Sequence, residues 1–502
     1  MVSLPRPRAV LAATAVAALA SSLMVAGPAQ AVPNANTSSK LTKAVTVEGV
    51  LEHLRALEEI GDENGGYRAS GTAGYDLSVE YVVQRLLAAG YTPEIQEFEF
   101  PFYQEVSPAH LERVSPTATT YTEGVDFTTM EYSGAGDLTG TVQPVDIMLA
   151  MPRSSTSGCE AADFAGFVPG NIALIQRGTC TYAQKAANAA DAGAVGVIIF
   201  NQGNSPDREG IPAATLGGPT ELPVVATTFA LGADLAAAGT VVHLVTDTFS
   251  EVRTTYNVIA QTDAGRTDQV VMAGAHLDST LDGVAINDDG SGSAVLLEIA
   301  EQMAKTKPNN AVRFAWFGAE ENGLLGSEYY VNTRTEEQLD AIKAYLNFDM
   351  LGSSNYARFV YDGDDAPEGS NYLQSVFEDY LGSRGLPTSE SDLTGSSDYA
   401  PFAAVGIPVG GVFAGAGGIK TPEEQALYGG TAGQPYAPEY HTADDRVAAI
   451  NTTILDQFAD AAAHAIITLA YDLTALGGER VPGKSHGAAQ PASAQFRQGA
   501  PA

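Results

Sequence analysis

The stretch "QVVMAGAHLDSTLDGVAINDDGSGSAVLLEIAEQMAK", residues 269–305, contains the kinds of segment that decide the fold. It opens with a short, nearly continuous apolar run, which is typical of a strand buried on both faces. A polar loop follows, and then "SAVLLEIAEQMAK" has the pattern of a helix. The alternation continues in "AVRFAWFGAEE", "GLLGSEYYV" and "AIKAYLNFDM". We therefore predict an α/β fold with a mixed, largely parallel central sheet flanked by helices.

Histidine or carboxylate residues follow each of the predicted buried strands. The run "VVMAGA" leads into His276, with Asp278 two residues later, and "RFAWFGA" leads into Glu320 and Glu321. The run "AYLNF" leads into Asp349. Because ligands of open parallel sheets gather at the carboxyl ends of the strands, we expect these side chains to converge there.

Two adjacent acids, Asp288 and Asp289, stand in the glycine-containing loop before the predicted helix. Charges that converge in a buried place must be paired, and a site with two metal ions needs one carboxylate that contacts both. A loop that turns sharply at Gly290 can present such a group. We predict that Asp288 bridges two ions, and that Asp289 points away and caps the helix that begins near Ser291.

A charge count supports two divalent ions. Asp288, Glu321 and Asp349 bring −3, while His276 and His441, the latter from "PEYHTADD", are neutral. Two divalent ions and one hydroxide balance that charge. Imidazole and carboxylate ligands together suit zinc, so this set predicts a two-metal hydrolytic site.

Each of these signals has a plainer interpretation when it is taken alone. Acidic pairs also occur at 58–59, 364–365 and 444–445, where a solvated surface is the ordinary explanation. A lone histidine after a strand, or His243 within "VVHLV", is commonly structural. The joint placement at successive strand ends favours the metal site.

Length and composition limit which domain organisations and partners are expected. The chain has 502 residues, of which 45% are hydrophobic, and a net charge of −34. This length predicts two or three domains. The charge would repel nucleic acid and anionic membranes, so we expect neither as a partner.

Residues 1–31 have the pattern of a secretory signal. Arg6 and Arg8 precede a long apolar run, and "AQA" at 29–31 offers a cleavage site between small residues. The alternative is a membrane anchor. We expect the signal to be removed and the protein to be secreted.

The pattern of apolar and polar residues changes between residues 131 and 248. There "NIALIQRGTCTYAQKAANAADAGAVGVIIFNQ" predicts a strand at 172–175, a helix at 182–192 and a strand at 195–200. We interpret 131–248 as an inserted domain that divides a larger one into 32–130 and 249–476. Residues 32–45 are polar and expected to be loose, and the Gly-, Ala-, Pro- and Ser-rich tail 477–502 to be disordered.

The chain has two cysteines, Cys159 and Cys180. Outside the cell they can form a disulfide, and the alternative is two free buried thiols.

Several stretches resemble the secreted dizinc aminopeptidases of the bacterial leucyl aminopeptidase type, a zinc exopeptidase family. These stretches are "AGAHLDS", "INDDGSGSA", "WFGAEENGLLGS", "NFDM", "GSSDYAPF" and "EYHTADD". The segment "LIQRGTCTYAQKAANAADAGAVGVIIFN" is similar to a protease-associated (PA) domain, which members of this family carry at the same insertion point.

The resemblance implies a role for each residue. One zinc would be held by His276 and Asp349, and the other by Glu321 and His441, with Asp288 shared. Glu320 would be the general base toward a bridging metal-bound water, and Asp278 would orient His276. Tyr440 would hydrogen-bond the oxyanion. An aminopeptidase must also recognise a free α-ammonium group, and we expect Glu320 and Asp349 to bind it. The resemblance also implies a cis peptide after Asp288.

The sequence departs from the family pattern at three positions. Ser396 stands where close relatives have an arginine that helps to bind substrate. Glu439 and Asp444 stand where close relatives have two disulfide-bonded cysteines. The loop that carries Tyr440 and His441 must therefore be held in another way.

We predict a secreted, monomeric zinc aminopeptidase that releases apolar, leucine-like residues from the N-termini of peptides and proteins. The sequence leaves open whether calcium also binds. The alternatives are a metallo-carboxypeptidase or a glutaminyl cyclase on the same scaffold, and a non-catalytic binding module. The cyclases of this fold use one zinc ion, so a metal count separates them from the aminopeptidase.

Overall fold

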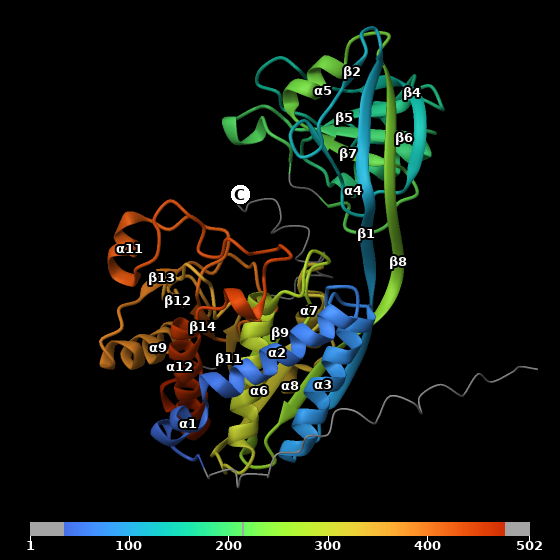
Figure 1. Ribbon diagram of the computed structural model, residues 1–502. Helices are drawn as coiled ribbons and strands as arrows, with labels where there is room; N and C mark the ends of the chain where they lie inside the picture. Colours follow the sequence, from blue (N-terminus) through green and yellow to red (C-terminus); the bar gives the residue numbers. More distant parts are fainter. Residues whose placement is uncertain (1–34, 213–214, 477–502) are drawn as a thin grey trace, which may run out of the picture.

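The computed structural model describes residues 35–212 and 215–476. The predicted secretory signal at 1–31 and the predicted tail at 477–502 lie outside the described residues. Figure 1 shows a large body of helices around a sheet, and a smaller body joined to it by two long strands, β1 (Glu94–Ser115) and β8 (Val241–Gln261).

The sheet of the large body has the strand order β13-β12-β14-β11-β9-β10-β8. The four strands β10, β9, β11 and β14 run parallel, while β8 is antiparallel to β10 and β12 is antiparallel to β14. This confirms the predicted mixed, largely parallel sheet. The strands are β9 (Arg266–His276), β10 (Asn310–Phe317), β11 (Ile342–Phe348), β12 (Phe359–Tyr361), β13 (Ser389–Ser391) and β14 (Val409–Phe413).

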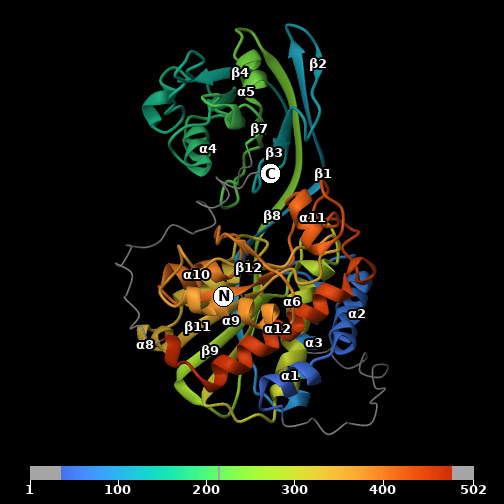
Figure 2. The same ribbon diagram turned by 90° about the vertical axis from the view of Figure 1, so that its left-hand side faces the viewer.

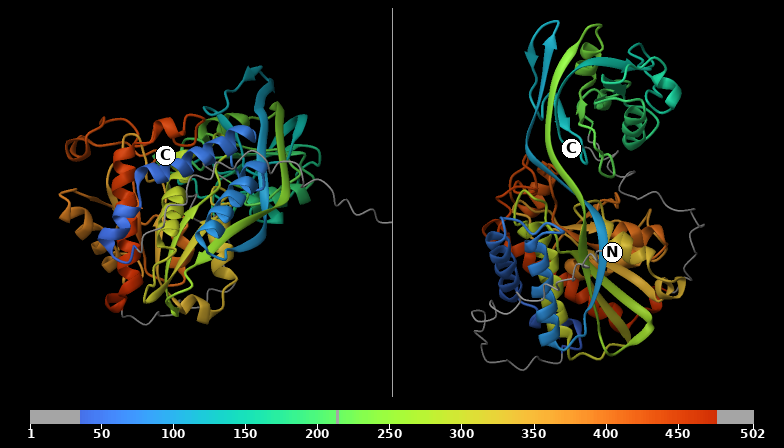
Figure 3. Two further views of the ribbon diagram at one scale, coloured as in Figure 1. Left: turned by 60° about the horizontal axis from the view of Figure 1, so that its bottom comes forward. Right: turned by 90° about the vertical axis from the view of Figure 1, so that its right-hand side faces the viewer.

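Helices cover both faces of this sheet, as the views in Figures 1, 2 and 3 show. One face packs against α1 (Ser38–Ala44), α2 (Val47–Glu63), α3 (Ala73–Ala89), α6 (Ser291–Met303), α9 (Ser370–Ser383) and α12 (Thr452–Tyr471). The other face packs against α7 (Leu325–Asn332), α8 (Glu336–Asp340) and α10 (Tyr399–Ala404). The short helix α11 (Pro422–Tyr428) contributes Tyr428 to a small separate cluster.

Helix ends follow from local sequence signals. Helix α2 begins where the Thr46 hydroxyl accepts a hydrogen bond from the N–H of Gly49. Helix α3 ends at Gly90, whose φ of 102° places it in the left-handed region that favours glycine. The expectation of loose structure across 32–45 is wrong for the residues of α1. Leu41 is fully buried and α1 packs on α12, so tertiary contact stabilises a helix that its own sequence does not favour.

The smaller body continues the sheet through the order β8-β4-β5-β6-β7-β3. Strands β5 (Ile172–Gln176) and β6 (Gly196–Phe200) and helix α4 (Tyr182–Asp191) lie within a residue or so of their predicted bounds. The remaining elements are β3 (Phe127–Thr129), β4 (Gly136–Val145), β7 (Val224–Thr227) and α5 (Phe229–Leu235). Every residue of β5, β6 and β7 is buried, so this body has its own core.

The apolar and polar alternation of "EIQEFEF", residues 94–100, predicts a strand, and β1 is much longer than that motif. β1 pairs antiparallel with β8 from Glu94 opposite Ile259 to Ser115 opposite Val241. Its far end also pairs with β2 (Thr119–Thr120). Sequence alternation alone did not reveal this length, because the pairing with β8 supplies the hydrogen bonds along an exposed segment.

Within the described residues, no helix has both the length and the apolar character that crossing a bilayer requires. Cys159 and Cys180 form a disulfide in the smaller body, as the first of the two alternatives predicted.

Replacing both cysteines by serine should destabilise the smaller body. The disulfide closes a loop with a sequence separation of 21, and the chain-entropy relation gives about 3 kcal/mol for a loop of this size. Thermal unfolding of the double variant should show an earlier transition of the smaller body, while peptidase turnover at 25 °C stays unchanged. An unaltered unfolding profile would contradict this expectation.

Candidate metal centre

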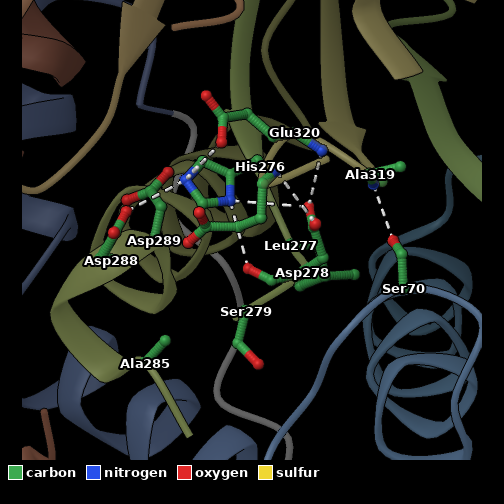
Figure 4. A network of polar contacts seen from close by, with 12 residues as sticks. Ser70, His276, Leu277, Asp278, Ser279, Ala285, Asp288, Asp289, Ala319 and Glu320 are labelled. Carbon is green, nitrogen blue, oxygen red and sulfur yellow. Dashed lines mark hydrogen bonds and ion pairs between the residues drawn. The ribbon is translucent and has the colours of Figure 1, made fainter. Parts of the chain in front are cut away.

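The side chains predicted to converge do so at the carboxyl ends of β9, β10 and β11. His276 is the last residue of β9, Glu320 and Glu321 follow β10, and Asp349 follows β11. Asp288 comes from the irregular turn Ile286–Gly290 before α6, and His441 from the loop before α12. Figure 4 shows His276, Asp288 and Glu320 turned toward one another.

Two groups of potential metal ligands overlap at Asp288. One group is His276, Asp288 and Asp349, and the other is Asp288, Glu321 and His441; in each group the ligand atoms lie within 4.8 Å of one another. His276 Nε2 lies 3.2 Å from Asp288 Oδ1 and 3.7 Å from Asp349 Oδ1. Within this group, Oδ1 is the oxygen of Asp288 that faces His276.

The second group is equally close. His441 Nε2 lies 3.1 Å from Asp288 Oδ2 and 3.2 Å from Glu321 Oε2. Glu320 lies beside the pair, with Oε2 3.9 Å from His276 Nε2. It also belongs, with His276 and Glu321, to a third group of possible ligands.

The residues fit a cation by their burial and their chemistry. Asp349 Oδ1 is buried, and no described residue donates a hydrogen bond to it. Asp288 is only 5% exposed and has two imidazoles beside it. Mixed imidazole and carboxylate ligands are those that zinc prefers in proteins.

Among the described residues of this cluster, the carboxylates outnumber the imidazoles, and the pKa values reflect that excess of negative charge. Burial raises the pKa of Glu320 well above its usual range; Glu321, Asp398 and Asp349 raise it further, while His276 opposes the rise. Burial alone would lower the pKa of His441, but Glu321 and Asp288 raise it to about 10. Metal ions would supply the missing positive charge and displace such protons.

Asp289 has a different task from its neighbour. Its Oδ1 accepts hydrogen bonds from the N–H of Gly292 at 2.7 Å and from the N–H of Met350 at 3.1 Å. It thus caps the start of α6, as the sequence predicted, and the structure shows that it also ties that helix to the turn after Asp349. The Asp288–Asp289 peptide bond is cis, which the family resemblance also implied.

Asp278 links His276 to the Glu320–Glu321 turn. The Asp278 carboxylate accepts from the N–H of Glu320 at 3.2 Å and of Glu321 at 3.4 Å. The hydrogen-bond partner of His276 Nδ1 is the backbone carbonyl oxygen of Asp278 at 3.1 Å, while the carboxylate lies 3.6 Å away. The residue therefore holds the ring and the turn together (Figure 4).

Backbone geometry near the candidate ligands is unusual. Ala319, Met350 and His441 have φ values of 52°, 55° and 55°, in the region that non-glycine residues rarely adopt. Each of them is a candidate ligand or adjoins Glu320 or Asp349. Such conformations cost on the order of 1–3 kcal/mol each and occur where the surrounding structure fixes them.

Arg68 is a site residue that the sequence did not reveal. It is fully buried, and its guanidinium donates to the carbonyl oxygens of Leu277, Val284 and Ala285. These bonds join both ends of the loop that precedes Asp288. A single arginine in a glycine-rich connection carries no motif, so only the tertiary structure gives it this role.

Asp445 and Ser397 also fix ligands. Asp445 accepts from the N–H of Asn287 at 2.7 Å and of Asp288 at 3.1 Å, and it is almost fully buried. The solvated-surface interpretation of the 444–445 pair is therefore wrong for its second member. The Ser397 hydroxyl donates to Asp349 Oδ2 at 2.6 Å.

The loop that carries Tyr440 and His441 is held without cysteines. Glu439 accepts from the N–H and the hydroxyl of Ser354, at 3.2 and 2.8 Å. The Tyr440 and His441 rings stack with centroids 3.8 Å apart. Ser396, the position where close relatives have an arginine, has a small side chain, and its hydroxyl lies 2.9 Å from that of Thr394.

A cleft of about 1230 Å³ opens above these side chains. Tyr440, His441, Glu320, Asp349 and Ser396 line it. Its apolar lining comes from several elements of the large body and from β1: Phe102, Leu281, Leu324, Met350 and Phe413.

The fold and these side chains together define a metallopeptidase of the exopeptidase type, and comparison with known proteins agrees. Residues 257–466 match the model of peptidase family M28, and residues 139–235 match the PA domain. An aminopeptidase of Pseudomonas aeruginosa is 46% identical over 85% of this chain and 82% of its own length.

Solved structures point the same way. The aminopeptidase from Aneurinibacillus sp. strain AM-1 has a TM-score of 0.68 and 27% identity, over 89% of this chain and 98% of that one. BSAP, a zinc aminopeptidase from Bacillus subtilis, has a TM-score of 0.56 and 26% identity, over 87% and 95%. The chain belongs to peptidase family M28 and carries a PA domain. It is a zinc-dependent aminopeptidase, a hydrolase of peptide bonds.

Replacing Asp445 by asparagine should weaken zinc binding by about 10- to 100-fold, the usual effect of losing a partner that orients a metal ligand. The amide would turn a donor toward one of the two N–H groups at 287–288, so the turn that presents Asp288 would loosen. Competition with a zinc chelator measures the affinity. Asp444→Asn, at the exposed neighbouring position, is the matched control; equal losses in both variants would contradict the role of Asp445.

Proposed function

We propose that this protein removes N-terminal residues from peptides with two zinc ions. His276 and Asp349 hold one ion, Glu321 and His441 hold the other, and Asp288 is shared. One observation carries the proposal: two three-residue ligand groups have only Asp288 in common, and its two oxygens face different histidines at 3.2 and 3.1 Å.

The charges support two ions better than one. The three carboxylates of Asp288, Glu321 and Asp349 bring −3, and Glu320 adds a fourth acid beside them. Zinc ions at this place supply Lewis acidity, which polarises a carbonyl group and makes water more acidic. The protein's own residues then have to position the substrate and move protons.

Glu320 is the proposed general base. Neither of the two groups that share Asp288 includes it, so it is free to exchange protons while those residues hold metal. A carboxylate beside the proposed metal ligands, 3.9 Å from His276 Nε2, suits a group that takes a proton from the attacking water and returns it to the leaving amine. Asp278 supports this geometry because it holds the backbone N–H of Glu320.

Substrate recognition rests on the same carboxylates and on the cleft. Glu320 and Asp349 offer negative charge to the free α-ammonium group that distinguishes an N-terminus. Tyr440 lines the cleft beside His441, which supports a role in donating its hydroxyl to the developing oxyanion. Phe102, Leu324 and Phe413 give the cleft apolar surface, which supports a preference for leucine-like side chains.

The wider organisation belongs to the same proposal. Residues 32–130 and 249–476 form the peptidase domain, and residues 131–248 the inserted domain around the PA match at 139–235. The disulfide supports export, with 1–31 as a secretory signal, and we propose a secreted monomer that acts on peptide N-termini.

Removal and return of zinc test the metal proposal. Chelation should abolish hydrolysis of leucine p-nitroanilide, and stepwise return of zinc should restore it, with full activity reached only at two or more equivalents per chain. Full activity with one equivalent, together with a preference for glutaminyl substrates, would favour the cyclase alternative. No activity at any zinc loading, over several pH values and aminoacyl substrates, would overturn the proposal.

Glu320→Gln tests the base. The variant should keep its zinc content but lose activity by about 10²- to 10⁴-fold, because the amide cannot take a proton. Asp282→Asn, at an exposed carboxylate that lines the same cleft, is the control and should stay near wild-type activity. Turnover within a few-fold of wild type in the Glu320 variant would mean that another group is the base.

A further inference from the structure

A second cluster of metal-binding side chains lies far along the chain from the catalytic ligands, where β1 and β8 meet β4. His110, Glu112 and His243 have ligand atoms within 4.8 Å of one another. Asp137 adds a fourth group, because its Oδ1 lies 2.8 Å from His243 Nε2. We propose that this cluster binds one divalent transition-metal ion, with zinc as the foremost candidate.

Strand register places these four side chains on one face of the sheet. In antiparallel pairing, residues directly opposite one another point to the same face. Glu112 on β1 is opposite His243 on β8, and His110 and Asp137 are both opposite Val245. The four groups therefore occupy two adjacent rows across three paired strands, with β8 in the middle.

The opposite face fixes this arrangement. Leu111 and Leu244, which alternate with the cluster residues on β1 and β8, are fully buried in a core of the smaller body. The strands cannot turn without exposing that core, so the cluster side chains stay on the outer, partly exposed face. Ligands on paired strands are more precisely spaced than ligands on loops.

The distances fit one ion after small side-chain movements. His110 Nε2 lies 3.6 Å from Glu112 Oε2, and the two imidazole rings have centroids 5.5 Å apart. Bonds of about 2.0–2.2 Å from zinc to nitrogen and oxygen put neighbouring ligand atoms a little more than 3 Å apart in a tetrahedral site. His243 and Asp137 are already in contact, so Asp137 serves either as the fourth ligand or as the group that orients the His243 ring.

Charge and chemistry select the kind of ion. Two neutral imidazoles with the carboxylates of Glu112 and Asp137 carry −2, which one divalent ion neutralises. Imidazole nitrogen favours zinc, copper or nickel over calcium or magnesium, which prefer oxygen ligands. The net charge of −34 also raises the local concentration of cations around the chain.

The site has a structural consequence. β1 leaves the large body and β8 returns to it, and these two long strands connect the large and small bodies (Figure 1). An ion held by His110 and His243 would link these strands to each other, and through Asp137 to β4. Its role would be to stiffen the strands that position the small body, without any part in peptide hydrolysis.

Metal counting and copper spectroscopy test the site on the purified full-length chain. Wild-type protein dialysed against zinc should bind one ion more than the variant His110→Ala/His243→Ala. Glu112→Gln, a milder change, should weaken binding of that ion at least tenfold. All variants should keep wild-type hydrolysis of leucine p-nitroanilide. His464→Gln is the control, since His464 hydrogen-bonds Ser38 and stands outside every cluster found among the described residues.

Copper(II) distinguishes the two kinds of site. Each of the two proposed catalytic ligand groups contains one histidine, whereas this cluster contains two. Electron paramagnetic resonance should therefore detect a copper population with two nitrogen ligands in wild-type protein and in His464→Gln, but not in the double variant. Equal zinc counts and equal copper spectra in wild type and double variant would overturn the proposal. A failure of the catalytic proposal would appear instead as lost activity in every protein.

Discussion

Several buried carboxylates meet at one end of the sheet, and this excess of negative charge is the constraint on which the rest of the site depends. Asp288, Glu320 and Glu321 are held within a few ångströms of one another, with two imidazoles between them. In a buried setting such charges are tolerated only with partners, since water is excluded. The high pKa of Glu320 and of His441 expresses the same demand for positive charge that zinc meets.

A layer of hydrogen bonds behind the ligands makes this crowding possible. Arg68 holds the loop before Asp288 by three carbonyl groups, and Asp445 holds the turn itself by two N–H groups. Asp289 holds the N–H of Met350, next to Asp349, and the Ser397 hydroxyl holds the Asp349 carboxylate itself. The segments that carry the ligands are thus fixed mainly by hydrogen bonds to their backbone atoms.

The long strands β1 and β8 serve both bodies of the protein. Near the large body, β1 contributes Phe102 and Gln104 to the lining of the catalytic cleft, and further along it carries His110 and Glu112. β8 pairs with β1 along the whole length of β1. A change in the position of the small body would therefore also shift the part of β1 that lines the cleft. The stiffness of these strands is therefore relevant to substrate access.

The sequence alone determined the α/β class, the main elements and the candidate ligands, because a buried strand and the polar residue after it are local features. Strand register, the partners of buried charges and the packing of α1 were decided by the tertiary structure. Arg68 stood in a stretch without a motif, and Asp445 was interpreted as half of a solvated acidic pair. Glu439 showed that a family cysteine is absent, but only the structure shows that Ser354 holds this loop in its place. The face shared by His110 and His243 depends on the pairing of β1 with β8, which sets His110 opposite Val245 and Glu112 opposite His243, and no local pattern encodes this pairing.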